Sequence, residues 1–372
     1  MNKVYGLKFS WLVLVLIYCQ YNPDEDETPL TIEPISTLSI PLDSLTPIPT
    51  TRTQLLDSQQ LVLLNPKLNA LQFYEFKSRG RLLKRLVFAT EGEHGVGQIS
   101  KFFVHSPDSI FLLNAPQYQV YLANANAQII RKYSLLKSKI GPNTGMPDPF
   151  PLSEIVTHRG KLYLASLPDL HPATKEYYKG KQAFIQLDIK TGDFAYLFGY
   201  PATYQQAHFP NQFTMHSFAI IPTLDKIIHS YSADDKIQVA DLTHQQVEEY
   251  PANSPLFGEI APLKSPVFDE TQNNQLGNQR PRYLNIKFDL QHKILARAAL
   301  TAAYDEAGHP QPTKGSLTFL NEDFKKIGAA VFEENHLLLN FHFQAGYLYI
   351  LLENQESEDE MVYQQYALRQ VK

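Results

Sequence analysis

Asp108-Ser-Ile-Phe-Leu-Leu113 places a short apolar run directly after the turn sequence His105-Ser-Pro-Asp108. Proline, serine and aspartate favour a turn, and the run that follows has the length of a β-strand. A turn followed by a short apolar run recurs five more times along the chain. These five runs are residues 61–64, 162–165, 227–230, 294–297 and 348–351.

The six runs are regularly spaced. Their first apolar residues are at positions 61, 110, 162, 227, 294 and 348, so successive runs are 49 to 67 residues apart. A strand-containing unit that repeats about every 50 residues is typical of a β-propeller. A β-sandwich is the main alternative, but regular repetition favours a radial arrangement, and few windows show a helical period. We therefore predict an all-β fold, a six-bladed β-propeller.

Most units divide into four predicted strands. In the fifth unit these are residues 282–289, 294–300, 317–320 and 326–332. The sixth unit offers only three, at 336–343, 347–352 and 361–368. Residues 30–42 alternate in polarity and contain Pro34 and Pro41, as expected of an edge strand. We predict that this N-terminal strand completes the last blade and closes the ring. Residues 174–182 and 303–308 are expected to form a turn or two of helix.

The composition limits the partners of the chain. It has 372 residues, of which 44% are hydrophobic, and a formal net charge of -5. Such a chain can bury a large core, and the absence of a basic run argues against nucleic acid as a partner. Cys19 is the only cysteine, so stability must come from burial rather than from disulfides.

Residues 1–18 have the features of an export signal. Lys3 and Lys8 supply a positive charge before an apolar run, residues 9–17. This run is too short to span a membrane. Leu16-Ile-Tyr-Cys19 resembles a bacterial lipobox, in which the signal is cut before a cysteine that becomes lipidated, although Tyr18 is larger than the residue usual there. We expect lipidation at Cys19 and a membrane anchor. An ordinary signal peptide with an incidental cysteine is the alternative.

Residues 19–29 are expected to be a tether between the lipid and a single propeller domain, residues 30–372. The tether contains four consecutive acids, Asp24-Glu-Asp-Glu27. An acidic stretch beside a lipid anchor resembles the signal that sends Bacteroidota lipoproteins to the outer cell surface; a solvated tether is the alternative. The predicted location is the outer membrane or the cell surface.

The long loops of the predicted propeller gather on one face. They are residues 137–150, 166–182, 201–212, 251–280, 301–315 and 353–360. Each follows the second or the fourth strand of a unit, and in a propeller these links lie on the same face. Insertions on one face often mark a binding surface, so we expect a protein or glycan partner there.

One stretch resembles a known family. Glu91-Gly-Glu-His-Gly-Val-Gly-Gln-Ile-Ser100 is a glycine-rich link that leads into a strand, and Asp108-Ser-Ile-Phe111 follows. Together with Cys19 and the six units, this resembles the six-bladed-propeller lipoproteins of Bacteroidota that carry only a domain-of-unknown-function label. The chain is more distantly similar to NHL- and TolB-like propellers. The resemblance implies the fold and the anchor but brings no catalytic residues.

Histidines give only a weak metal signal. His336 and His342 are six residues apart on one predicted strand, about 20 Å, which is too far to chelate one ion. His208 and His216 flank a turn, but no third ligand completes the set. We predict no metal site and no cofactor.

Other catalytic patterns are also weak. The glycines between Gly92 and Gly97 are not followed by a helix, so they indicate a tight turn rather than a dinucleotide loop. Asp305-Glu306 and Glu358-Asp-Glu360 lie in long loops, where a glycosidase would need paired carboxyl groups, but solvated acids are the commoner case. No Gly-x-Ser-x-Gly motif is present.

The remaining candidate is the mouth of the central channel, where each unit's first strand begins near the long loops. The polar residues near those starts are Arg52, Lys101, Glu154, His216, Arg282 and His336. Converging polar groups can bind a small molecule or an anion, although they can also be solvated or pair with one another. We expect a non-catalytic binding or scaffold lipoprotein. The alternative is a hydrolase or lyase that acts on a glycan or peptide at the channel mouth.

Overall fold

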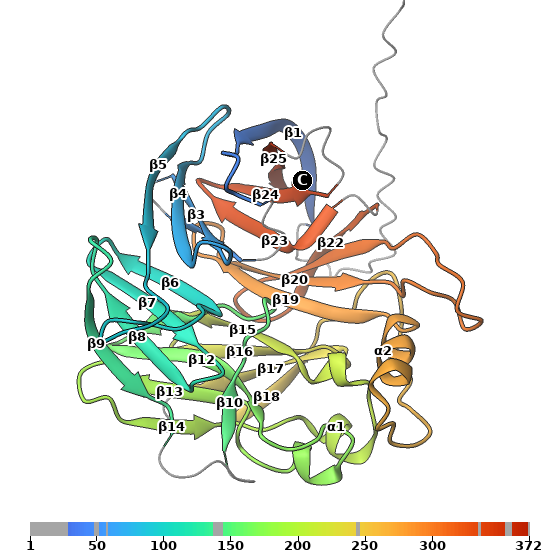
Figure 1. Ribbon diagram of the computed structural model, residues 1–372. Coiled ribbons are helices and arrows are strands. Elements are labelled where there is room, and N and C mark those ends of the chain that lie inside the picture. Colours follow the sequence, from blue (N-terminus) through green and yellow to red (C-terminus); the bar gives the residue numbers. More distant parts are fainter. Residues whose placement is uncertain are drawn as a thin grey trace, which may run out of the picture.

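The computed structural model describes residues 29–47, 52–56, 59–136, 144–242, 246–333, 336–353 and 359–370. Within them, six antiparallel sheets follow one another around a centre (Figure 1). The prediction of an all-β, six-bladed propeller is confirmed. The six repeated runs are the second strand of each blade, which explains why their spacing revealed the number of blades.

Four blades contain four strands each, paired in chain order. Blade 1 consists of β2 (Thr53–Leu56), β3 (Gln60–Asn65), β4 (Ala70–Glu75) and β5 (Leu82–Val87). Blade 2 consists of β6 (Lys101–Ser106), β7 (Ser109–Asn114), β8 (Gln119–Ala123) and β9 (Ile129–Ser134). Blade 4 consists of β15 (His216–Ile221), β16 (Lys226–Tyr231), β17 (Lys236–Asp241) and β18 (Val247–Pro251). Blade 5 consists of β19 (Arg282–Asp289), β20 (Ile294–Leu300), β21 (Gly315–Leu320) and β22 (Lys326–Phe332).

The sixth blade joins the two ends of the chain, as predicted. It contains β23 (His336–Gln344), β24 (Tyr347–Leu352), β25 (Glu360–Gln370) and the N-terminal β1 (Leu30–Pro41). β1 pairs antiparallel with β25 from Leu30 opposite Gln370 to Pro41 opposite Glu360. The register shifts between Pro34 and Ser36, where a proline cannot donate to a regular ladder.

Blade 3 has an unexpected inner edge. It contains β10 (Gly145–Pro147), β11 (Val156–His158), β12 (Lys161–Pro168), β13 (Phe184–Asp188) and β14 (Phe194–Leu197). The two three-residue strands β10 and β11 both pair with β12, at opposite ends of it. The loop between them, residues 148–155, is therefore held beside the channel instead of continuing a strand.

Helices are few and lie in the long links. The structure has α1 (Ala202–Gln206), α2 (Glu270–Asn278) and the 3-10 turns η1 (Lys175–Tyr178) and η2 (Asn211–Thr214). The turn η1 confirms the helical turn expected within residues 174–182. The expectation of helix at 303–308 is wrong: these residues form a hairpin with a bridge between Tyr304 and Pro310. No helix of the described ranges is long and apolar enough to cross a membrane.

The link between the first and second strand is short in all six blades. In five of them the residue just before the second strand has a positive φ: Gln59, Gly160, Asp225, Lys293 and Gly346. A left-handed residue reverses the chain within a few positions. Because these turns lie at one face, the described parts of the links that connect second to third strands and one blade to the next lie on the opposite face, called the long-loop face below.

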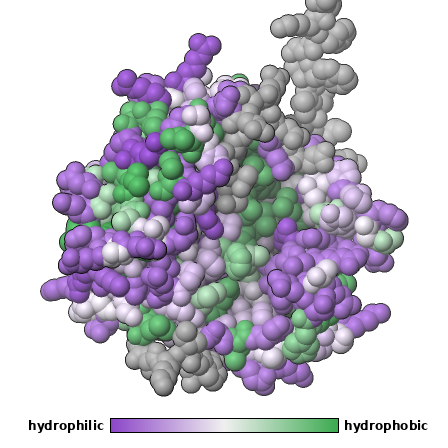
Figure 2. Space-filling view, in the orientation of Figure 1, coloured by the Kyte–Doolittle hydropathy of each residue, from purple (hydrophilic) through white to green (hydrophobic). Residues whose placement is uncertain are grey.

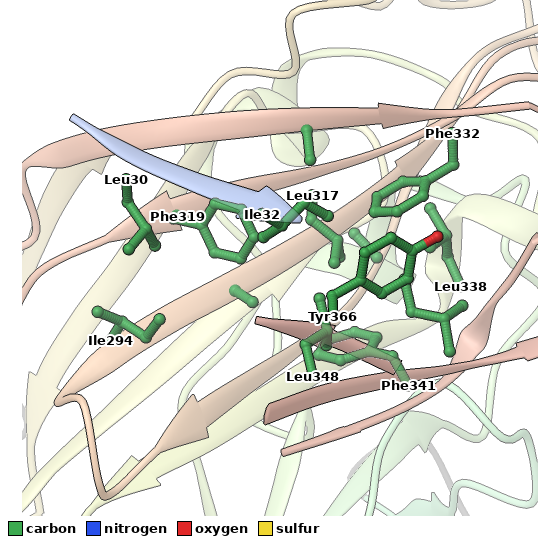
Figure 3. Close-up of a cluster of buried hydrophobic side chains, with 14 of the residues drawn as sticks. Leu30, Ile32, Ile294, Leu317, Phe319, Phe332, Leu338, Phe341, Leu348 and Tyr366 are labelled. Atoms are coloured by element: carbon green, nitrogen blue, oxygen red, sulfur yellow. The ribbon is translucent and has the colours of Figure 1, made fainter. Parts of the chain in front are cut away.

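Hydrophobic clusters fill the spaces between neighbouring blades. Between blades 5 and 6, Leu317 and Phe319 pack with Phe341, Leu348 and the N-terminal Ile32 (Figure 3). Burying β1 side chains in this cluster stabilises the ring closure beyond the strand pairing itself. The outside is different: Figure 2 shows a mostly hydrophilic face with smaller hydrophobic patches, one of them near its centre.

Candidate functional site

The central channel is the candidate site, because all six blades contribute to it. A cavity of about 50 Å³ lies near the starts of the inner strands, at the end of the channel toward the long-loop face. A wider chamber of about 250 Å³ follows further along the same strands. The two spaces share lining residues, namely Gln54, Glu154, Phe218, Ile286 and Lys287. The cavity of about 50 Å³ is called the channel mouth below, and the space of about 250 Å³ is called the chamber.

Side chains tie the inner strands to one another around the channel. The amide of Gln54 on β2 bonds the backbone of Val104 on β6 twice, donating at 3.0 Å and accepting at 2.8 Å. Thr53 donates to Asn340 of β23 at 2.6 Å. Ser217 of β15 accepts from the backbone of Ile286 at 3.2 Å. These links hold the wall of the channel in a fixed arrangement before any ligand arrives.

Lys101 forms a buried ion pair at the mouth. Its ammonium donates to Asp148 Oδ2 at 3.1 Å and to Ser153 Oγ at 2.8 Å. The Ser153 hydroxyl donates in turn to the same Asp148 oxygen at 3.0 Å. Burial lowers the pKa of Lys101, while the Asp148 carboxylate acts in the opposite direction. The positive charge of Lys101 is thus balanced within the protein, on the loop that β10 and β11 position.

A second ion pair lines the channel mouth. Lys287 of β19 donates to the Glu154 carboxylate, which comes from the loop before β11. The Lys287 ammonium also lies 5.3 Å from the centre of the Phe341 ring. Glu154 is half exposed and Lys287 is mostly covered. This pair therefore joins blades 3 and 5, which flank blade 4, and balances one more positive charge.

Arg52 differs from both lysines, because no described residue balances its charge. It lines the channel mouth just before β2, and its Nε is buried without a hydrogen-bond partner. No other described residue accepts a hydrogen bond from its guanidinium or forms an ion pair with it. Burial lowers the pKa of Arg52, and its charge also lowers the pKa of nearby Lys101. An anion in the mouth would satisfy this arginine.

The structure brings together three of the six residues that the sequence singled out. Arg52, Lys101 and Glu154 line the channel mouth. The other three do not line it. Arg282 donates to Gln212 at 2.7 Å, and His336 contacts the Tyr366 hydroxyl at 2.7 Å in a separate small cavity between blades 5 and 6.

His216 lies in an aromatic cluster between blades. Its ring stacks on Tyr231, and its Nε2 is 2.8 Å from the carbonyl oxygen of Ala183. Burial lowers its pKa, so the ring is neutral at physiological pH. The neighbouring Ser217 lines the channel instead, since successive residues of a strand point to opposite sides.

Sequence reasoning missed several residues of the mouth. Asn285 and Lys287 are two apart on β19 and both line the cavity. Their alternation with apolar neighbours in Leu284-Asn-Ile-Lys-Phe288 was an available signal of a polar channel side. Asp148 and Ser153 had no such signal, because the sequence does not show that their loop folds back between two short strands.

Other candidates lie elsewhere. Among the described residues, no three His, Cys, Asp or Glu side chains gather closely enough to hold a metal ion.

The glycine-rich link has a structural use: at Gly97, with φ +64, a Cβ atom would lie 2.1 Å from the Asn114 amide. That amide donates to the carbonyl of Val96 and joins the link to the end of β7. Cys19 and residues 354–358, which include the acidic Glu358, lie outside the described residues.

Comparisons with known proteins agree with this fold. The family model described as "Domain of unknown function (DUF4221)" matches residues 29–330. A crystal structure of a DUF4221 member from Bacteroides vulgatus is 17% identical, with a TM-score of 0.75, and the match covers 92% of this chain and 99% of that one. A Bacteroides fragilis protein named as exported is 12% identical, with a TM-score of 0.53, covering 91% of this chain and 95% of that one.

At such identities the two structures support the fold alone. No curated protein matches the chain at a significant level. The resemblance to Bacteroidota propellers with a domain-of-unknown-function label is confirmed, since the family model covers well over half of the sequence. The chain belongs to the DUF4221 family.

Proposed function

We propose that this protein is an exported, non-catalytic propeller that binds an anionic group of a small ligand in its channel mouth. The observation that carries the proposal is Arg52, a partly buried guanidinium that faces a cavity without a described partner. Leaving such a charge uncompensated costs stability, and a ligand that completes it would remove this cost.

The dimensions limit the class of ligand. A cavity of about 50 Å³ accepts one compact group such as a carboxylate, sulfate or phosphate. Both lysines of the mouth are already paired, so a single negative charge is enough to balance Arg52. The rest of the ligand would occupy the chamber below or extend toward the long loops.

A second candidate function, a hydrolase, is favoured by one contact. Ser153 Oγ is 2.8 Å from the Lys101 ammonium, and a serine beside a lysine of lowered pKa can be a nucleophile. Asp148 opposes this use, because it accepts hydrogen bonds from both groups and favours the protonated lysine. If the protein were such a hydrolase, Ser153→Ala would abolish hydrolysis of p-nitrophenyl esters; we expect no hydrolysis that depends on Ser153.

Export and lipid anchoring at Cys19 are part of the proposal. The apolar run 9–17, the lipobox-like sequence and the name of the Bacteroides fragilis neighbour, which describes an exported protein, support it. In an anchored protein on the outer membrane or cell surface, the channel mouth would meet ligands outside the cell. Cys19→Ala should move the protein out of the membrane fraction of cells that process lipoproteins; a variant that stays there would contradict the anchor.

The binding proposal is tested by thermal stability in the presence of anions. The purified protein is melted with phosphate, sulfate, citrate and acetate at equal ionic strength. A ligand at 100 times its dissociation constant adds about 2.7 kcal/mol, which is a shift of several degrees for a domain of this size. We expect at least one of these anions to raise the melting temperature.

Two variants locate the effect. Arg52→Ala should abolish the shift. Arg369→Ala is the matched control, because Arg369 is an exposed arginine on β25 that pairs with the exposed Glu33. The proposal fails if Arg52→Ala keeps the full shift, or if none of the four anions stabilises the wild type.

A further inference from the structure

A second recess lies on the long-loop face, away from the channel. It measures about 280 Å³ and is lined by Gln275 and Asn278 of α2 and by Tyr304 and Gly308 of the hairpin 301–314. None of these four side chains carries a charge. The recess therefore differs in chemistry from the channel mouth, which four charged residues line: Arg52, Lys101, Glu154 and Lys287.

The recess is held open by hydrogen bonds of its own walls. The backbone amides of Ala303 and Tyr304 both donate to the carbonyl oxygen of Asn278, at 2.9 and 3.2 Å. The tip of the hairpin is closed by Asp305, whose carboxylate accepts from the backbone of His309 at 2.8 Å. The hairpin is thus fixed to the end of the helix, and a ligand would meet a formed site.

The polar groups of the recess are free to bind. Among the described residues, neither the Gln275 amide nor the Tyr304 hydroxyl has a hydrogen-bond partner. Asn278 Oδ1 accepts from Gln212 at 3.2 Å, which leaves the Asn278 amino group available. Gly308 has φ +85, and a Cβ there would lie 3.7 Å from Gln275 Nε2. Both residues line the recess, so a longer side chain at position 308 would extend toward it.

We propose that this recess binds a neutral sugar residue of a glycan. A tyrosine ring offers an apolar face for the C–H side of a sugar, and its hydroxyl and the two amides match sugar hydroxyl groups as donors and acceptors. An anionic ligand would find no cation here, and an apolar one would leave the amides unsatisfied. The site is independent of Arg52 and extends the function beyond anion binding.

The test is calorimetric titration of the purified protein with three neutral oligosaccharides: maltohexaose, cellohexaose and N-acetylchitohexaose. We expect at least one to bind. Tyr304→Ala should weaken that binding about tenfold, and Gln275→Ala about threefold. Tyr304→Phe keeps the ring and should lose less affinity than Tyr304→Ala, which separates stacking from hydrogen bonding.

Two controls place the site. Phe268→Ala removes an aromatic side chain that is 61% exposed at the other end of α2 and should leave the affinity unchanged. Arg52→Ala should also leave it unchanged, so failure of the anion proposal and failure of this one are distinguishable. The inference is overturned if none of the three oligosaccharides binds, or if Tyr304→Ala binds as tightly as the wild type.

Discussion

Two arginines of this propeller are at least partly buried, but they differ in their hydrogen-bond partners. Arg297 lies between blades 4 and 5, is 1% exposed, and donates to Ser230 Oγ and to the carbonyl oxygens of Ala252, Tyr231 and Asp234. Its guanidinium carbon is also 3.6 Å from the centre of the Tyr283 ring. Arg52 lines the channel mouth and has no described partner.

The difference is between a charge that is satisfied within the fold and one that we propose binds a ligand. Burial lowers the pKa of Arg297 to about 10, so it stays charged at neutral pH, and the hydrogen bonds offset its loss of water. Arg52 has lost part of its water without such replacement. We infer from this contrast that Arg52, which has no partner among the described residues, is completed by a ligand, as proposed above.

The largest expected effect is on Arg297. Arg297→Ala should lower the free energy of unfolding by about 3–5 kcal/mol, because it leaves buried carbonyl groups without donors and opens a cavity. Arg297→Lys keeps the charge but loses the planar fork and the ring contact, and should recover only part of the stability. Urea denaturation measures both; a loss below about 1 kcal/mol for Arg297→Ala would contradict the structural role.

Arg52→Ala should behave in the opposite way. The unfolding free energy without ligand should change by less than about 1 kcal/mol, because the variant breaks no described hydrogen bond. Affinity for the stabilising anion should fall by about 2 kcal/mol, roughly 30-fold, the usual contribution of a charged hydrogen bond. Titration of the anion into both proteins gives this value. Strong destabilisation without a change in affinity would make Arg52 structural as well.

Two histidines extend the comparison to pH. His229 and His216 are both buried, but neither ring nitrogen of His229 has a hydrogen-bond partner. Burial lowers the pKa of His229 well below its ordinary value. Below about pH 6.5 the unfolded chain therefore binds a proton that the folded chain excludes, so stability falls as the pH falls. The expected loss is about 1 kcal/mol between pH 6.5 and 5.5.

His229→Phe should remove this contribution. The variant keeps an aromatic ring beside Phe184 and Phe198, and its loss of stability from pH 6.5 to 5.5 should be smaller than that of the wild type. Chemical denaturation at the two pH values measures the change. Equal acid sensitivity of the two proteins would show that His229 does not titrate as its burial indicates.

The smallest effect is expected at the surface. Arg369 and Glu33 form a pair in which both side chains are more than 60% exposed, 63% and 64%. Such pairs contribute about 0–1 kcal/mol, so Arg369→Ala should leave the melting temperature nearly unchanged. A loss comparable to that of Arg297→Ala would mean that strand pairing of β1 with β25 depends on this contact.

The fold could be predicted because it repeats. The second strands are buried on both faces, so each gives a continuous apolar run, and a turn with a left-handed residue marks the start of most of them. Residues 282–289, 294–300 and 326–332 were predicted with the bounds that the structure has. The helix α2 was missed, although Asp269, which accepts from the backbone of Gln272 at 2.7 Å, is a recognisable N-cap.

The site could be predicted only in part. The start of an inner strand is visible in the sequence, and this placed Arg52 and Lys101 correctly near the channel mouth. The side to which a strand residue points is harder to predict, because a shift of one position reverses it. His216 faces the aromatic cluster, and Ser217 faces the channel. That Arg52 lacks a partner is a three-dimensional fact, which depends on Asp148 and Glu154 pairing with other residues.

The most direct test is a crystal structure of the protein soaked in selenate, a tetrahedral anion with a strong anomalous signal. The account predicts an anomalous peak in the channel mouth within hydrogen-bond distance of the Arg52 guanidinium, about 2.7–3.2 Å from oxygen to nitrogen. The same soak of Arg52→Ala should leave the mouth empty. Selenate bound only elsewhere on the wild type, or bound equally in the variant, would contradict the assignment of Arg52 as the anion-binding residue.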